Sequence, residues 1–287
     1  MMFRCSLGVE PVPTNRRSTT LTRALSGAPP ARRQSNPQFA STLERGLRVL
    51  QCFSANTPLL GNADIAGMTG LPKPTVSRLT FTLIELGYLR RCAESARFEL
   101  ASSVLCLGYP VLARLEFRRA AMPHLKGLAE EIDGTAGVSV RDRLRMVTLE
   151  TYTHKDVFRR RPGIGLPLNL VESTPGLAWL VGARTDERDR ALREVAHDVP
   201  EHLVRLQGEI LAGRQQLARH GYLVRCGHIR PETAGLSTPL RRRPGEELVI
   251  LACAVRTPAK QADAVMRRTG ERLLETARRI SADVLGV

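Results

Sequence analysis

Residues 60–88 read LGNADIAGMTGLPKPTVSRLTFTLIELGY, and this stretch decides the fold of the N-terminal part of the chain. Asn62 is a favourable N-cap for a first short helix, and Gly70 tolerates the left-handed conformation of a helix C-cap. Pro74 fits the first turn of a second helix, which Gly87 ends. Two short helices joined by a glycine-containing turn predict a helix-turn-helix, the motif that places its second helix in the DNA major groove.

The second helix of this pattern has an apolar stripe and a polar arc. Spacing of three and four residues predicts that the stripe faces a core, and its members are Val76, Leu79, Leu83 and Leu86. The opposite arc and its flanks supply the candidate DNA contacts Lys73, Thr75, Ser77, Arg78 and Thr82. Arginine and hydroxyl side chains suit both phosphates and base edges. Phe81 also lies on this arc, and we expect it to cover the neighbouring helix rather than to touch a thymine methyl group.

The flanking segments complete a three-helix module with a wing. Ser41-Thr-Leu-Glu44 is typical of a capping box, and the helix that it opens would bury Leu43, Leu47, Leu50 and Phe53. Residues 88–100 alternate weakly around a polar centre, which predicts a short hairpin. An αα-hairpin used only for packing is the alternative. The cap, turn, basic arc and wing together favour a winged helix-turn-helix DNA-binding domain over residues 39–101.

The charge of the chain gives weaker support for DNA binding. The formal net charge is +15, but 39 of the 43 basic residues are arginine, a bias that genome composition also produces. Residues 39–100 hold seven basic and five acidic side chains, a net of only +2. Residues 1–38 contain six arginines and five prolines with few apolar residues, which predicts a disordered basic tail or an annotated start placed too far upstream. Arg23 interrupts any apolar run after Arg16 and Arg17, so we expect no export signal.

Neither metal binding nor catalysis is indicated. The six cysteines form no Cys-x-x-Cys pair, and no histidine has ligand spacing beside them. Residues 235–239 lack the second glycine of a nucleophile elbow, and residues 67–73 separate the glycine from the lysine that a P-loop joins. No stretch reaches transmembrane length. We therefore expect a reduced cytoplasmic protein at the nucleoid, with no metal, no cofactor, no membrane partner and no enzymatic activity.

The second half of the chain predicts a different architecture. Residues 101–132 have a helical pattern with interruptions at Pro110 and Pro123, and we expect a linker helix over residues 102–121. Strands are expected at residues 136–140, 144–152, 221–226, 236–240 and 247–256, and helices at residues 175–182, 186–196, 201–220 and 258–285. This grouping predicts an α+β domain with an antiparallel sheet over residues 122–287. Arg-Arg-Arg-Pro-Gly occurs twice, at residues 159–163 and 241–245, and favours solvated turns over anion sites.

Several of these segments resemble the isocitrate lyase regulator (IclR) family of bacterial transcription factors. The strongest are GLPKPTVSRL at residues 70–79 and ELGY at residues 85–88, followed by RFEL at residues 97–100. Weaker matches are residues 166–168, 221–222 and 235–240. The resemblance implies a winged helix-turn-helix, a linker helix and a GAF-like effector domain. It also implies homodimers, or dimers of dimers, on double-stranded operator DNA.

The resemblance further implies a pocket for a small molecule in the second domain. Carried onto this chain, its walls would include Ser173, Thr174, Arg225, Gly235 and Ser237, with Cys253, Ala254 or Arg256 from the last strand. Adjacent strand residues face opposite sides, so those last three cannot all line the pocket. The family often has paired hydroxyl residues on this strand, whereas residues 251–256 here read LACAVR. The ligand would therefore be less polar, or be anchored by Arg225 or Arg256.

The sequence thus predicts a regulator of transcription whose operator binding is switched by a small organic acid, aromatic acids included. Two other classes of function remain open. One is a nucleoid-associated DNA binder whose C-terminal domain only oligomerises, and the other is an enzyme that retains a helix-turn-helix. The missing catalytic residues argue against the enzyme. Leu112 and Leu115 are candidate contacts of a homodimer, unless they pack on their own effector domain.

Overall fold

The structure is a computed structural model that describes residues 37–54, 57–114, 116–154, 163–227, 231–240, 245–258 and 261–285. The chain divides into two compact units, one ending at Arg114 and the other formed by the residues after it. This division falls inside residues 102–121, the expected linker helix. Nearly all of the expected basic tail lies outside the described residues, as do residues 159–162 and 241–244 of the two predicted turns.

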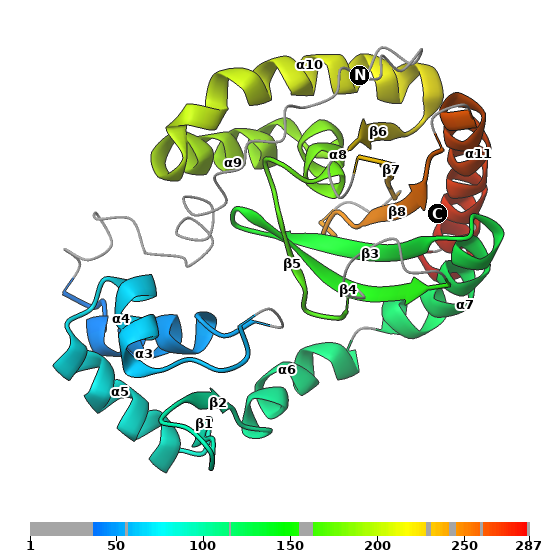
Figure 1. Ribbon diagram of the computed structural model, residues 1–287. Coiled ribbons are helices and arrows are strands. Elements are labelled where there is room, and N and C mark those ends of the chain that lie inside the picture. The colour runs from blue at the N-terminus through cyan, green and yellow to red at the C-terminus, as the bar shows by residue number, and fades with distance from the viewer. Residues whose placement is uncertain are drawn as a thin grey trace. The chain divides into compact units, whose positions relative to one another are not determined.

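The N-terminal unit is a winged helix-turn-helix, as the sequence predicts (Figure 1). Its elements are α3 (Ser41–Gln51), α4 (Asn62–Thr69), α5 (Lys73–Glu85), β1 (Leu89–Arg91), β2 (Phe98–Leu100) and α6 (Ser103–Arg114). Strands β1 and β2 pair antiparallel and form the wing. Side chains from α3, α4, α5 and the wing form one core, which includes Val49, Cys52, Ile65, Val76, Leu83, Leu89 and Phe98. This core fixes the position of α5.

Glycines end both helices of the motif, but the predicted N-caps are wrong. The φ angle of Gly70 is 70°, which confirms the left-handed end predicted there, and Gly87, with a φ angle of 74°, follows the second helix in the same conformation. Helix α4 is capped at Gly61, whose N–H donates to the Asp64 carboxylate over 2.9 Å. Asn62 instead accepts a hydrogen bond from Thr80, so its side chain joins α4 to α5. Helix α3 follows Ala40 without a side-chain cap, so Ser41 forms no capping box.

The apolar faces also differ in part from the prediction. Val76 and Leu83 are buried, but Leu86 is 61% exposed because it lies at the C-cap, beyond the last turn of α5. Thr80 is buried instead, and its hydroxyl proton is shared between the Val76 carbonyl and Asn62 Oδ1, which offsets the cost of burying it. On α3 the structure buries Val49 and half-buries Leu50, and Phe53, which follows the helix, is also buried. Leu43 and Leu47, expected in the core, are exposed.

The second unit has the expected α+β fold, built on one antiparallel sheet. The strands are β3 (Thr135–Asp142), β4 (Arg145–Thr153), β5 (Pro167–Asn169), β6 (Leu223–Cys226), β7 (Thr233–Pro239) and β8 (Ile250–Arg256). Their order across the sheet is β5-β4-β3-β8-β7-β6. Strand β5 was not predicted, because three residues at a sheet edge are too short to show alternation.

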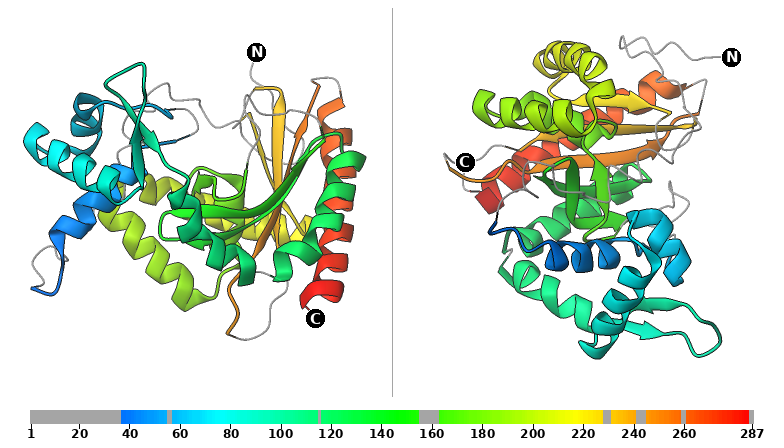
Figure 2. Two further views of the ribbon diagram at one scale, coloured as in Figure 1. Left: turned by 90° about the horizontal axis from the view of Figure 1, so that it is seen from below. Right: turned by 90° about the vertical axis from the view of Figure 1, so that its left-hand side faces the viewer.

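Helices cover both faces of this sheet (Figures 1 and 2). On one face lie α7 (Glu116–Glu131) and α11 (Ala262–Ile280), the latter continued by a π-helical turn (Ser281–Leu285). Toward the other face lie α8 (Thr174–Gly182), α9 (Thr185–Asp198) and α10 (Leu203–His220), with a 3-10 turn (Pro200–His202) before α10. The main core of the unit forms between the sheet and the pair α7 and α11.

The two prolines that were expected to interrupt helices lie inside them. Pro110 is within α6 and Pro123 within α7, whereas α6 ends at Arg114 and α7 begins at Glu116. An internal proline costs a helix about 3 kcal/mol. In α7 that cost is offset because Leu125 and Leu128 are both buried in the core, where each contributes about 1.5 to 3 kcal/mol. Tertiary packing therefore overrides the local signal.

Candidate functional site

The outward arc of α5 presents the predicted DNA contacts to solvent. Lys73, Ser77, Arg78 and Thr82 are exposed, and Thr75 is half-buried. The Thr82 hydroxyl donates to the Arg78 carbonyl within the helix. The buried residues Val76, Thr80 and Leu83 lie on the opposite side and hold the helix against the module. The arrangement therefore leaves a polar helix face, with Arg78 near its middle, free to enter a groove.

Phe81 and the wing differ from what the sequence predicted. Phe81 is 61% exposed, so the expectation that it covers a neighbouring helix is wrong. On the wing, the Arg91 guanidinium lies 5.5 Å from the centre of the Phe98 ring, and Arg90 pairs with Glu99 at 2.8 Å. Both arginines are exposed. Arginines on a hairpin were the available signal, and such residues suit contacts to phosphates.

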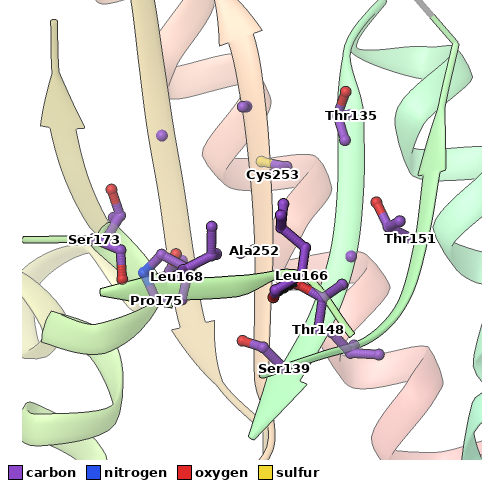
Figure 3. A pocket seen from close by; sticks show the side chains of 16 residues that line it. Thr135, Ser139, Thr148, Thr151, Leu166, Leu168, Ser173, Pro175, Ala252 and Cys253 are labelled. Atoms are coloured by element: carbon purple, nitrogen blue, oxygen red, sulfur yellow. Dashed lines mark hydrogen bonds between the residues drawn. The ribbon is translucent and has the colours of Figure 1, made fainter. Parts of the chain in front are cut away.

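A pocket of about 140 Å³ opens between the central strands of the sheet and a cover formed by the β5 region and the start of α8 (Figure 3). Its floor is made of small residues on the central strands, namely Gly137, Ser139, Gly235, Ser237, Ala252 and Ala254. Leu166 and Leu168 of the β5 region and Ser173, Thr174 and Pro175 at the start of α8 cover it. These small side chains leave space above the sheet, because along each strand they alternate with larger side chains that point to the core on the other face.

The pocket brings together most of the residues predicted for it. Ser173, Thr174, Gly235, Ser237, Cys253 and Ala254 all border the cavity. The register resolves the last strand: Ala254 lies opposite Gly235 on the pocket face, while Cys253 packs into the core beside α7 and α11. Burial raises the pKa of the Cys253 thiol to about 12. That thiol is therefore neutral at ordinary pH and unsuited to nucleophilic chemistry.

The two arginines predicted as anchors do not line the pocket. Arg256 is 63% exposed and pairs with Glu232 at 3.7 Å. Arg225 is buried behind the cover, where its guanidinium forms an ion pair with Glu209 of α10. Burial lowers the pKa of Arg225, and the Glu209 carboxylate opposes that shift. None of the described residues that line the cavity carries a charged side chain.

Arg225 organises the chain that covers the pocket. Its guanidinium donates to the carbonyls of three successive residues, Val171, Glu172 and Ser173. We call residues 170–173 the wall loop. The wall loop leads into α8, whose N-cap Ser173 accepts a hydrogen bond from the Gly176 N–H at 3.1 Å. The buried arginine thus connects the wall loop to α10 and fixes the start of α8 over the cavity.

Together these features define a class, a winged helix-turn-helix DNA-binding protein with a second domain that holds an uncharged pocket. Comparison with known proteins identifies the family. A family model described as the IclR helix-turn-helix domain matches residues 42–92. The HTH-type transcriptional regulator TsaQ1/TsaQ2 of Comamonas testosteroni is 32% identical over 208 residues, covering 71% of this chain and 74% of that protein. The chain belongs to the IclR family of helix-turn-helix regulators of transcription.

A solved structure and a further sequence relative agree with this assignment. An IclR family transcriptional regulator from Brucella abortus is 32% identical and has a TM-score of 0.73, over 91% of this chain and 98% of that one. The transcriptional repressor IclR of Escherichia coli strain K12 is 24% identical over 161 residues, which cover 53% of this chain and 59% of the repressor. In the described part of the chain, no helix is both long and apolar enough to cross a membrane.

Proposed function

We propose that this protein binds operator DNA through α5 and that a small organic acid in the pocket modulates this binding. The observation that carries the proposal is the pairing of an exposed polar recognition helix with an uncharged pocket in the second unit. A ligand changes operator binding only if it prefers one of two states of the protein. The pocket would therefore belong to a protein whose DNA modules have two arrangements. Such a regulator acts on chromosomal DNA in the cytoplasm.

The expected loss of DNA affinity in Arg78→Ala tests the first half of the proposal. Removal of one base contact should weaken binding to a specific site by roughly 1 to 3 kcal/mol, about 5-fold to 150-fold in Kd. Fluorescence anisotropy with a duplex from the promoter of the protein's own gene, at fixed salt, measures this. Arg214→Ala removes an exposed arginine from α10 and serves as the matched control. Equal operator affinity of Arg78→Ala and the parent would exclude Arg78 as a DNA contact.

Two observations support a carboxylate as the effector. The N-terminus of α8 lies at the pocket through Thr174, and a helix N-terminus carries partial positive charge. In addition, an IclR homologue from Microbacterium hydrocarbonoxydans, which shares the fold at 20% identity and a TM-score of 0.58, was crystallised with 4-hydroxybenzoate. The helix end and the hydroxyls around it replace the arginine that the sequence suggested as anchor.

We further propose that the protein is a homodimer through α6 and α3. Leu105, Leu107, Tyr109 and Val111 of α6 are exposed, as are Leu43 and Leu47 of α3. Large apolar residues gathered on one module are typical of an interface. Leu112 is half-buried on the same helix, and Leu115 lies outside the described residues. A symmetric pair would offer two recognition helices to a pseudo-palindromic site.

The double variant Leu105→Glu/Val111→Glu is expected to shift the dimer toward monomer, because charges would be buried without partners at the interface. Sedimentation velocity over a range of protein concentrations measures the shift. Leu211→Glu, which changes an equally exposed leucine on α10, should leave the dimer intact. A concentration-independent monomer in the parent protein would contradict the proposal.

A further inference from the structure

Most hydroxyl groups around the pocket already have protein partners. Thr135 Oγ1 donates to Thr153, Thr148 Oγ1 to the Leu166 carbonyl, and Thr151 Oγ1 to the Ala136 carbonyl. The Ser173 hydroxyl caps α8. These groups shape the cavity, but their hydrogen bonds are largely committed.

Two hydroxyls differ from the rest. Ser139 Oγ on β3 and Ser237 Oγ on β7 are buried and have no hydrogen-bond partner among the described residues. The exposed fractions of these residues are 4% and 0%, and both line the pocket. An unsatisfied buried polar group is costly, so native proteins usually pair it. Because both groups border one cavity, a bound ligand is the natural partner.

The register of the sheet sets the distance between the two serines. Ser237 pairs with Ala252, and Ala252 pairs with Gly137, two residues before Ser139 on β3. Two strand spacings across and two residues along place their Cα atoms about 12 Å apart. Because both serines lie on the same face of the sheet, a ligand that reaches both hydroxyls carries a polar atom at each end.

The space between the serines is apolar and small. Gly137 and Ala252 form the floor there, and Leu166 and Leu168 lie over it. Ser139 lies near the end of the cavity at which Thr148 is found, while Ser173 lies to the side (Figure 3). A cavity of about 150 Å³ in another protein takes one benzene ring, so the 140 Å³ here suits a single ring.

We propose, on the basis of the proposed function, that the effector is a one-ring acid with a hydrogen-bonding group at each end. Its carboxylate lies by Ser237 and the start of α8, and a second polar group opposite the carboxylate bonds Ser139. Ser139 is then the residue that selects para-substituted acids over unsubstituted ones. Ser237 serves every acid, because it lies at the carboxylate end.

Calorimetric titration with benzoate, 4-methylbenzoate and 4-hydroxybenzoate tests this assignment. The parent protein should bind 4-hydroxybenzoate about 5-fold to 10-fold more tightly than 4-methylbenzoate, which has a similar shape without the hydroxyl. Ser139→Ala should abolish this preference. Ser237→Ala should weaken all three acids. Thr151→Val, which removes a hydroxyl already bonded to the Ala136 carbonyl, should keep the preference.

Thermal unfolding of the same variants separates ligand recognition from a structural role. Removal of an unpaired hydroxyl should leave the Tm of Ser139→Ala without ligand equal to that of the parent or above it. A preference for 4-hydroxybenzoate that is retained in Ser139→Ala would overturn the role of Ser139 at any Tm, and so would the absence of binding by all three acids. Operator binding by the unliganded parent is measured separately. If the parent did not bind operator DNA, the proposed function itself would be overturned. If it bound operator DNA but none of the acids, only the proposed class of ligand would be overturned.

Discussion

The Arg225→Met variant is expected to lose about 2 to 4 kcal/mol of unfolding free energy in the C-terminal unit. Methionine would leave three wall-loop carbonyls and the Glu209 carboxylate without the guanidinium that now satisfies them. Removing one partner of a fully buried ion pair costs about 3 to 5 kcal/mol. The Glu209 side chain is 21% exposed, so water recovers part of that cost. Urea denaturation followed by circular dichroism measures the change.

Arg256→Met is the matched control, since Arg256 also lies on a strand of this sheet and pairs with a glutamate. It is mostly exposed, so its replacement should change stability by no more than about 0.5 kcal/mol. If Arg225→Met unfolded at the same urea concentration as the parent, the clamp on the wall loop would not contribute to stability.

The second large effect is expected for Gly176→Ala in the first turn of α8. A Cβ atom at this position would lie 2.0 Å from the carbonyl oxygen of Leu170 and 2.7 Å from its Cα. These are backbone atoms, so no side-chain rotation relieves the clash and the wall loop or the helix must move. We expect a loss of about 3 kcal/mol, at the upper end of ordinary overpacking. Binding of ligand in the pocket should be lost with it.

Gly208→Ala is expected to have the opposite effect on the stability of the same unit. Gly208 is exposed on α10, and an added Cβ would meet no atom within 4 Å. Alanine should therefore stabilise the helix by roughly 0.5 to 1 kcal/mol. Differential scanning calorimetry should give an unfolding temperature below that of the parent for Gly176→Ala and above it for Gly208→Ala. Equal transitions for Gly176→Ala and the parent would mean that the close approach of α8 to Leu170 is not required.

The local signals in the sequence predicted the DNA-binding unit well, because the ends of its helices depend on residues that are close together in the chain. Gly70 and Gly87 end the two helices of the motif where their left-handed conformations are needed. The errors arose where a side chain had more than one local option. Asn62 suits an N-cap, yet in the fold it accepts a hydrogen bond from Thr80, eighteen residues away. A single sequence does not decide between these two partners.

The pocket residues show the same limit at longer range. Arg225 on a strand suits a ligand anchor as well as a structural clamp, and its carbonyl partners lie more than fifty residues earlier in the chain. Ser139 was not predicted, although a signal existed: it is a polar residue in the otherwise apolar stretch AGVSV at residues 136–140. The alternation of the last strand was recognised, but only the register with β7 shows that Ala254 faces the cavity.

The alternation of these strands also separates two kinds of evolutionary constraint. Residues that build the main core, such as Leu236 and Leu251, point toward α7 and α11, whereas Gly235, Ala252 and Ala254 point into the cavity from the same strands. Substitutions at the cavity positions therefore change its volume and polarity with little effect on the core packing that holds the domain together. A gene duplicate could in this way acquire a new chemical signal through a few point mutations while it keeps the same scaffold and the same operator.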